Sequence, residues 1–243
     1  MAGRRGAKLS WWTLALLPLF LALCACDEPA AEPTDDTASA TTPPPAPAPE
    51  PAPAPTGPPL LNPKAATETA PDSYKVALKT TKGDAVIEVT RAWAPRGADR
   101  FYNLVKIGYY DDVAFYRVTF EVAQFGINGD PAVTKAWREA YILDEMVKQP
   151  NLKGMVTFAR RTSDTRTTQV FINLKDNSAD FDVQGFAPFG KVVEGMDVIE
   201  KLSNAHGERP QQGDAPKRMM EEGAEFIKKT YPKLDYIEKA TIL

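Results

Sequence analysis

Short apolar segments separated by glycine-containing turns most constrain how residues 73–243 can fold. Apolar and polar residues alternate along YKVALKT (74–80) and AVIEV (85–89), and the turn TKGD lies between them. This pattern is typical of a β-hairpin, because alternate side chains of a strand point to opposite faces of its sheet. Further short strands are expected at 113–118, 121–127, 154–160, 169–174 and 187–193.

Few segments have the spacing of a helix. Residues 95–107 begin at Pro95 and stop before Gly108, which is the usual order of proline and glycine around a helix. Other helices are expected at 196–202, in an insert at 137–146, and from residue 221 to a stop at Pro232 before a final strand. Many short strands with two core helices favour a closed β-barrel with helices over its ends.

The segment before this part has a different composition. Residues 26–72 are dominated by proline, alanine, threonine and acidic residues, as in TTPPPAPAPEPAPAPTGPP. Such a segment cannot bury enough apolar surface to offset the entropy lost on ordering, so we expect a disordered tail and a folded domain over 73–243. Alternating Ala-Pro favours extended polyproline II, which makes a semi-rigid spacer or, alternatively, a ligand for aromatic grooves.

The first residues have the layout of an export signal. Residues 1–25 start with basic side chains and continue as an apolar run, with an uncleaved membrane helix as the alternative. The ending Leu23-Cys24-Ala25-Cys26 resembles the lipobox of bacterial lipoproteins. That resemblance implies cleavage before Cys26, lipidation of Cys26, and a periplasm-facing place in the bacterial cell envelope, on either membrane. Cys24 fits less well because the residue before it is the bulky Leu23.

Charge and residue usage exclude several classes of function. Residues 73–243 contain 25 basic and 24 acidic residues, so the folded part lacks the basic footprint of a nucleic-acid-binding protein. Both cysteines precede residue 27, and His206 is the only histidine. The folded part therefore cannot contain a disulfide, a thiol nucleophile or a zinc site made of several histidines and cysteines. His206 lies in the polar stretch NAHGERPQQGD and is expected on the surface.

Several motifs occur together and in a fixed order between residues 74 and 202. They are FYNLVKIGYYDDVAFYRV, QFGINGDP, GMVTFAR, TTQVFIN and GFAPFGKVVEGMDVI. The set resembles the cyclophilin family of peptidyl-prolyl cis-trans isomerases. The resemblance implies a closed eight-stranded antiparallel barrel capped by two helices. It also implies a monomer without cofactor or metal that accelerates X-Pro isomerisation in proline-containing polypeptides, here exported proteins.

The resemblance also assigns residues to a site. Arg117 matches the catalytic hydrogen-bond donor, and Gln124 matches the glutamine that binds the substrate backbone. An arginine suits the first role because it stays charged and presents a rigid fork of donors. The positions implied to bind substrate are Phe120, Val122, Ala159, Arg160, Gln169, Phe171, Phe181 and Phe186.

The segment RVTFEVAQ departs from the family pattern because it is one residue shorter between Arg117 and Gln124. The pocket phenylalanine is then Phe120, or it is replaced by Glu121. Arg160, Arg161 and Arg166 are expected to add positive charge to the rim. The alternative function is accordingly a weak or inactive peptide-binding chaperone, and a third interpretation is a purely structural envelope lipoprotein.

Overall fold

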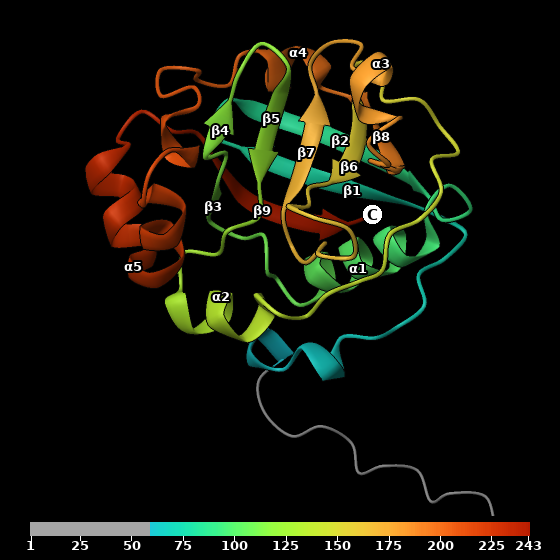
Figure 1. Ribbon diagram of the computed structural model, residues 1–243, viewed down its shortest axis with the longest axis horizontal. Coiled ribbons are helices and arrows are strands. Elements are labelled where there is room, and N and C mark those ends of the chain that lie inside the picture. Colours follow the sequence, from blue (N-terminus) through green and yellow to red (C-terminus); the bar gives the residue numbers. More distant parts are fainter. Residues whose placement is uncertain (1–58) are drawn as a thin grey trace, which may run out of the picture. The chain divides into compact units, whose positions relative to one another are not determined.

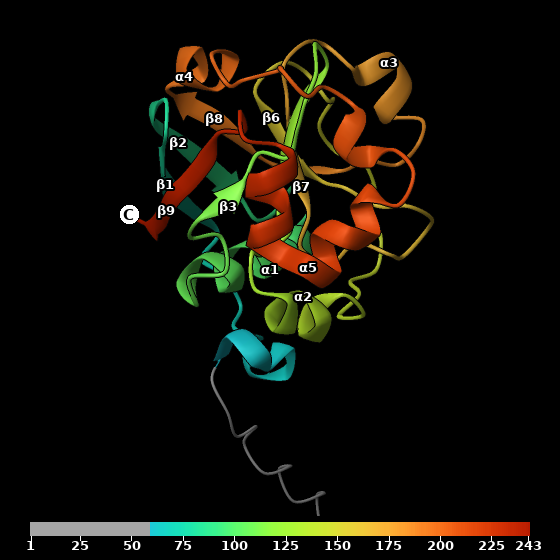
Figure 2. The same cartoon turned by 90° about the vertical axis from the view of Figure 1, so that its left-hand side faces the viewer.

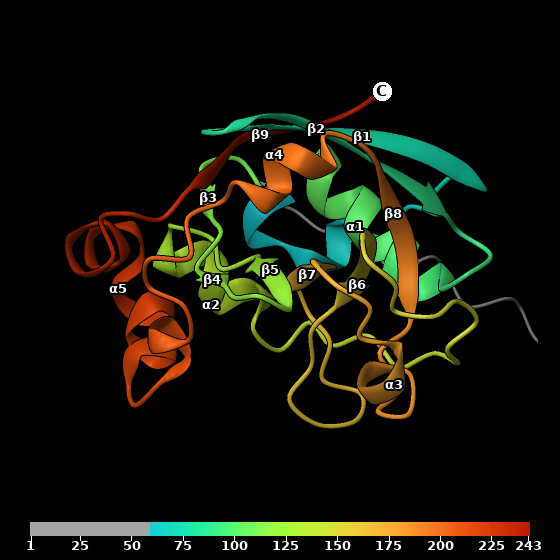
Figure 3. The same cartoon turned by 90° about the horizontal axis from the view of Figure 1, so that it is seen from above.

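Nine short strands form one antiparallel sheet in the computed structural model, which describes residues 59–243 (Figure 1). They are β1 (Ser73–Thr80), β2 (Gly83–Thr90), β3 (Val113–Ala114), β4 (Arg117–Val118), β5 (Val122–Phe125), β6 (Met155–Phe158), β7 (Val170–Asn173), β8 (Pro188–Glu194) and β9 (Tyr236–Ile242). Their order is β3-β9-β1-β2-β8-β6-β7-β5-β4. The sheet curls, so that β1, β2 and β9 lie opposite β5, β6 and β7 (Figure 3). The predicted mainly-β fold is confirmed, and every predicted strand segment contains a strand.

The closed barrel of eight strands is not confirmed. Residues 113–118, predicted as one strand, are divided: β3 pairs with β9, β4 pairs with β5, and in the described residues β3 and β4 do not pair with each other. Between them, Phe115 enters the main core and Tyr116 enters a second apolar cluster. The chain changes its partner strand here. The two edge strands of the sheet, β3 and β4, are therefore neighbours in sequence, but no backbone pairing joins them to close a barrel.

Helices lie around this sheet (Figure 1). They are α1 (Pro95–Lys106), α2 (Pro131–Trp137), α3 (Ser178–Phe181), α4 (Met196–Glu200) and α5 (Ala215–Thr230), with 3-10 turns η1 (Pro59–Leu61), η2 (Pro63–Ala65) and η3 (Arg209–Gln211). The predictions of α1 and α4 are confirmed; α5 is also a helix that ends before Pro232, but it begins at Ala215 and not at residue 221. The helical insert at 137–146 is wrong: α2 precedes it, capped by the Asp130 side chain, which accepts from the Ala132 N–H at 2.7 Å. After α2, Ile142 bridges to Arg166 instead of continuing the helix.

The N-terminus of α1 is capped from a distant loop. Ala94, at the N-cap, has no side-chain acceptor for the free N–H groups of the first turn. The Glu145 carboxylate accepts instead from the N–H groups of Arg96 at 2.6 Å and Gly97 at 3.1 Å. A carboxylate is stabilised there by the positive end of the helix dipole. Glu145 also pairs with the buried guanidinium of Arg166 at 3.0 Å, so this loop is fixed to both α1 and the segment before β7.

The C-terminal helix α5 lies beside the β3 edge and above α2 (Figure 2). Its apolar face forms the second cluster with Ala114, Tyr116 and Ile127. The helix is kinked at Gly223, whose φ of 65° and ψ of −144° are open essentially to glycine alone. The kink brings the Ala224 N–H within 2.8 Å of the Gly129 carbonyl oxygen. This contact fixes α5 to the loop that follows β5.

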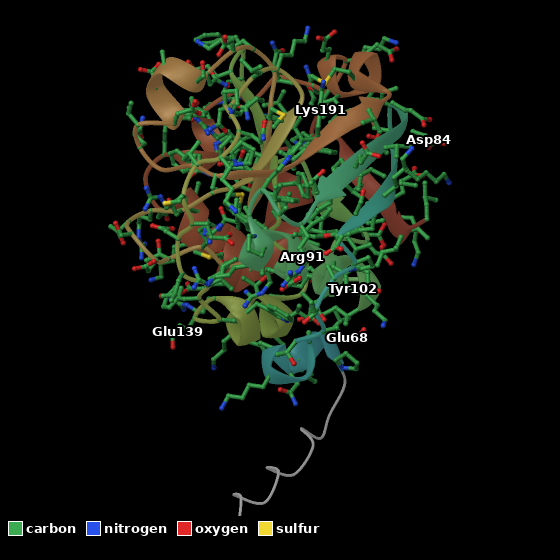
Figure 4. All side chains as sticks on the ribbon, turned by 90° about the vertical axis from the view of Figure 1, so that its right-hand side faces the viewer. Glu68, Asp84, Arg91, Tyr102, Glu139 and Lys191 are labelled. Carbon is green, nitrogen blue, oxygen red and sulfur yellow. The ribbon has the colours of Figure 1, made fainter. Side chains whose placement is uncertain are left out.

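Residues 59–72 lie against the domain. The Leu60 carbonyl oxygen accepts from the Trp137 indole at 2.8 Å, and the Asn103 side chain pairs with the backbone of Glu68. Figure 4 shows Glu68 close to Tyr102 on α1. The folded part therefore begins before the predicted boundary at residue 73.

The predicted signal peptide, Cys26 and the linker up to residue 58 lie outside the described residues. Among residues 59–243, no helix combines the length and the apolar character that crossing a membrane requires.

Replacing Gly223 by alanine should destabilise the protein strongly. An added Cβ would lie 2.3 Å from the Gly129 carbonyl oxygen, in addition to the strained backbone. We expect Gly223→Ala to lower the free energy of unfolding by about 2–5 kcal/mol in urea titrations. Gly213→Ala is the matched control, since Gly213 has a φ of 59° but nothing within 4 Å of its Cβ position. Its cost should be only about 1–2 kcal/mol. Equal losses for the two variants would contradict the close contact.

Candidate active site

Arg117 and Gln124 face each other across a tight hairpin. They are direct partners in the antiparallel pair β4–β5, so their side chains lie on the same face of the sheet. The Arg117 Nη1 donates to Gln124 Oε1 at 3.1 Å. The structure therefore brings together the two residues that the sequence predicted as catalytic.

Phe171 extends this row onto the next strand. It pairs with Gln124 in the β5–β7 ladder, and its ring is almost fully buried. The ring packs edge-on against Phe181 at 5.5 Å and Phe186 at 5.7 Å between ring centroids. These aromatic rings form an apolar floor next to the Arg117 guanidinium.

A chain of buried amides fixes α3, which carries Phe181. Asn177 donates to Asn173 at 2.8 Å, and Asn173 donates to Asn151 at 3.2 Å. Asn151 in turn donates to Asp182, directly after α3, at 2.7 Å. Because buried polar groups are costly when unpaired, this connected chain holds the aromatic floor in one position.

Gln169 links Gln124 to a buried tyrosine. Tyr116 donates to Gln169 Oε1 at 2.6 Å, and Gln124 Nε2 donates to the same oxygen at 3.4 Å. Burial raises the pKa of Tyr116, and the nearby Arg117 charge opposes this shift only in part. The hydroxyl therefore remains a proton donor at physiological pH and fixes the orientation of the glutamine pair.

These side chains lie in a cleft of about 610 Å³. Its lining includes almost every residue that the sequence assigned to the site: Arg117, Val122, Gln124, Ala159, Arg160, Gln169, Phe171, Phe181 and Phe186. The sequence-derived set is therefore one surface of the protein, assembled from β4, β5, β7, α3 and the loops that follow β6 and α3.

Phe120 is the exception, and its assignment to the pocket is wrong. The link between β4 and β5 spans only residues 119–121, and the Thr119 side chain accepts from the N–H groups of Glu121 and Val122. This tight turn places Phe120 at its tip, where it is 76% exposed and lies under the Lys175 ammonium. Glu121, the predicted alternative to Phe120, lines the cleft together with Val122.

The predicted positive rim is largely neutralised. Arg160 pairs with Asp144, and its guanidinium lies 5.5 Å from the centre of the Phe186 ring. Arg166 is buried and pairs with Glu145, so it contributes to structure and not to the rim. Arg161 is exposed and has no ion-pair partner within residues 59–243.

One wall of the cleft was missed from the sequence. It consists of Glu208 and Gln211, from the segment that leads into α5, and of Pro216 and Met220 in α5 itself. The Glu208 carboxylate accepts from Arg117 Nε at 2.8 Å and from Arg117 Nη2 at 2.7 Å. No local pattern in NAHGERPQQGD signals this pairing, because the two residues are 91 positions apart.

His206 is partly buried and supports the same segment. Its Nδ1 lies 3.1 Å from Arg209 Nη2, its Nε2 accepts from the Lys233 N–H at 3.3 Å, and its ring packs against Tyr231. Burial, followed by the charges of Arg209 and Lys233, lowers the pKa of His206. His206 therefore lies at the surface, as expected, although its ring also makes these contacts.

The site combines a fixed cationic donor, an amide pair and an apolar aromatic floor. This chemistry suits an extended polypeptide whose backbone is held by amides and whose apolar side chain rests on the rings. A donor beside an apolar surface can stabilise electron density that develops on a neutral group without transferring a proton.

Comparison with known proteins agrees with this geometry. Residues 75–221 match the family described as cyclophilin type peptidyl-prolyl cis-trans isomerase/CLD. A peptidyl-prolyl cis-trans isomerase of Acinetobacter baylyi is 35% identical over 137 residues, covering 53% of this chain and 71% of the relative. Peptidyl-prolyl cis-trans isomerase A of Dickeya dadantii is 33% identical over 171 residues, covering 66% and 88%.

A solved structure shows the same fold. The cyclophilin type isomerase of Cryptosporidium parvum superposes with a TM-score of 0.50 at 19% identity, over 70% of this chain and 98% of that one.

Protonation of His206 should loosen this wall. A lowered pKa in the folded state means that the stabilisation is present above the ordinary value of 6.5 and is lost as the pH falls through the folded pKa. We expect the free energy of unfolding to decrease between about pH 7.5 and about pH 5.5, and less so in His206→Gln. Urea titrations across this range measure both slopes. Identical slopes would exclude His206 as the titrating group.

Proposed function

The chain belongs to the cyclophilin-type peptidyl-prolyl cis-trans isomerases, and we propose that Arg117, Gln124 and Phe171 form its catalytic centre. As a member of this family, the protein catalyses cis–trans isomerisation of X-Pro bonds in polypeptides. The main support for this centre is the strand pairing: Arg117 on β4 is the partner of Gln124 on β5, and Gln124 is the partner of Phe171 on β7.

The reaction needs a donor and a pocket. The barrier of about 18–20 kcal/mol comes from amide resonance, which is lost when the bond twists. The proline nitrogen then becomes pyramidal and gains a lone pair, so a catalyst must bind this twisted state better than the planar one. The Arg117 guanidinium, fixed beside the apolar floor, donates to that nitrogen while Phe171 holds the proline ring.

Gln124 binds the substrate backbone next to the rotating bond. Its side chain accepts from Arg117 and donates toward Gln169, which Tyr116 fixes. The remaining lining residues of the predicted set form the binding surface. They are Val122, Ala159, Arg160, Gln169, Phe181 and Phe186.

The weak or inactive alternative rests on the shortened β4–β5 link and on the exposed Phe120. The comparisons do not support it, since the relatives named above carry isomerase names. The contact of Arg117 with Gln124 is also made despite the shorter link, since the two residues are direct partners in the β4–β5 pair.

The clients of the enzyme follow from the N-terminal sequence. Residues 1–26 favour export and lipidation of Cys26, and the proline-rich stretch favours a spacer between lipid and domain. Uncatalysed X-Pro isomerisation takes tens to hundreds of seconds, which limits the folding of many chains. The protein thus acts on exported proteins at the periplasmic side of the envelope. We also propose that it acts as a monomer, as the resemblance to the family implies.

Removing the donor should nearly abolish catalysis. We expect Arg117→Ala to lower kcat/KM on an Ala-Pro tetrapeptide by about 100-fold, as loss of one fixed donor does elsewhere. Phe120→Ala is the control, because that exposed ring lies outside the cleft. It should retain wild-type activity. An inactive wild type, or equal activity in wild type and Arg117→Ala, would reject the proposed centre.

Replacing Cys26 should release the protein from membranes. We expect wild type and Cys24→Ser to sediment with bacterial membranes and to incorporate labelled palmitate. Cys26→Ser should neither sediment with membranes nor incorporate palmitate, provided that residues 1–25 are removed by a cleavage that does not require lipidation. If Cys24→Ser is released instead, the lipidated residue is Cys24. If Cys26→Ser still sediments with membranes, residues 1–25 remain attached as an uncleaved helix.

A further inference from the structure

Glu208 contacts the proposed catalytic donor directly. Its two carboxylate oxygens lie 3.0 and 2.8 Å from Arg117 Nε, and Oε1 lies 2.7 Å from Nη2. The pair is half-exposed, with 24% of the Arg117 side chain and 47% of the Glu208 side chain accessible. Glu208 belongs to the segment between α4 and α5, and so approaches Arg117 from outside the sheet.

The donors of Arg117 can be assigned one by one. A guanidinium has five N–H groups in a planar fork. Glu208 takes the Nε donor and one donor of Nη2, and Gln124 takes one donor of Nη1. One N–H on Nη1 and one on Nη2 are left, and these are the donors available to a substrate.

The segment that carries Glu208 is itself fixed. Glu208 directly precedes η3, whose Pro210 is buried, and Gln211 of the same turn lines the cleft. His206 and the Lys233 N–H hold the segment on its other side. Glu208 is therefore presented from a defined position, and the side-chain entropy of Arg117 is reduced before substrate binds.

We propose that Glu208 is the positioning residue of the isomerase: it holds the Arg117 guanidinium edge-on, so that the free donors of Nη1 and Nη2 face the cleft. This inference rests on the proposed donor role of Arg117. A long arginine side chain has many rotamers, and a catalytic donor is effective only in the orientation that meets the twisted amide. Glu208 would therefore raise kcat and have little effect on KM.

The test is a double-mutant cycle with peptide kinetics on the full chain. Glu208→Gln keeps the shape of the side chain, but its amide nitrogen cannot accept a hydrogen bond. We expect it to lower kcat by about 3- to 10-fold and to change KM by less than about 2-fold. In an Arg117→Ala background the same change should have no further effect, because the group that it positions is gone.

The matched control is Glu222→Gln. Glu222 is as exposed as Glu208, at 47% of its side chain, and makes a two-contact pair with Arg218 on α5, at 2.5 and 3.1 Å; neither residue lines the cleft. This variant should leave kcat and KM unchanged. Urea titrations of both variants show whether either loses stability.

Each other outcome overturns the proposal in a recognisable way. Faster turnover in Glu208→Gln would mean that the carboxylate withholds Arg117 from substrate. An additive loss in the double variant, or an unchanged kcat in Glu208→Gln while Arg117→Ala is inactive, would mean that Glu208 does not act through Arg117. Equal activity of wild type and Arg117→Ala would instead reject the donor role on which the inference rests.

Discussion

The register of the β4–β5 and β5–β7 pairs is the constraint on which the cleft depends. It places Arg117 opposite Gln124 and Gln124 opposite Phe171, so a cation, an amide and an aromatic ring follow one another across the sheet. If the pairing of a strand shifted by one residue, its side chains would exchange faces, and its site residue would lie on the other face of the sheet. The short link over residues 119–121 fixes this register, since the Thr119 side chain accepts from the two N–H groups that follow it.

Sequence reasoning worked where a residue's place follows from its own strand. Gln124 and Phe171 were assigned by the motif resemblance to two short strands, and the register of those strands then brings them together. It failed for Phe120, because strand alternation does not extend into a tight turn that points its middle residue to solvent. It could not find Glu208, whose contact spans 91 residues and depends on how α5 packs. The break between β3 and β4 was hidden because no glycine, proline or polar turn residue separates them, only Phe115 and Tyr116.

Two polar networks hold the loops around the cleft. Glu145 joins the N-terminus of α1 to the buried Arg166, and Arg160 pairs with Asp144 in the same loop. On the opposite side, Asn173 belongs to the amide chain that fixes α3. These paired polar groups hold the loop that carries Arg160 and the helix that carries Phe181, on two sides of the cleft.

The division of residues 113–118 into β3 and β4 has a consequence for a protein that handles unfolded chains. A long free edge of a sheet offers unpaired backbone groups to any extended segment and promotes aggregation. Here each edge strand has two residues, and the C-terminal segment lies against both: Ala114 packs in the α5 cluster, and Arg117 pairs with Glu208. A client that enters the cleft therefore meets edge strands too short to hold it by backbone pairing, and it can leave after its proline has turned.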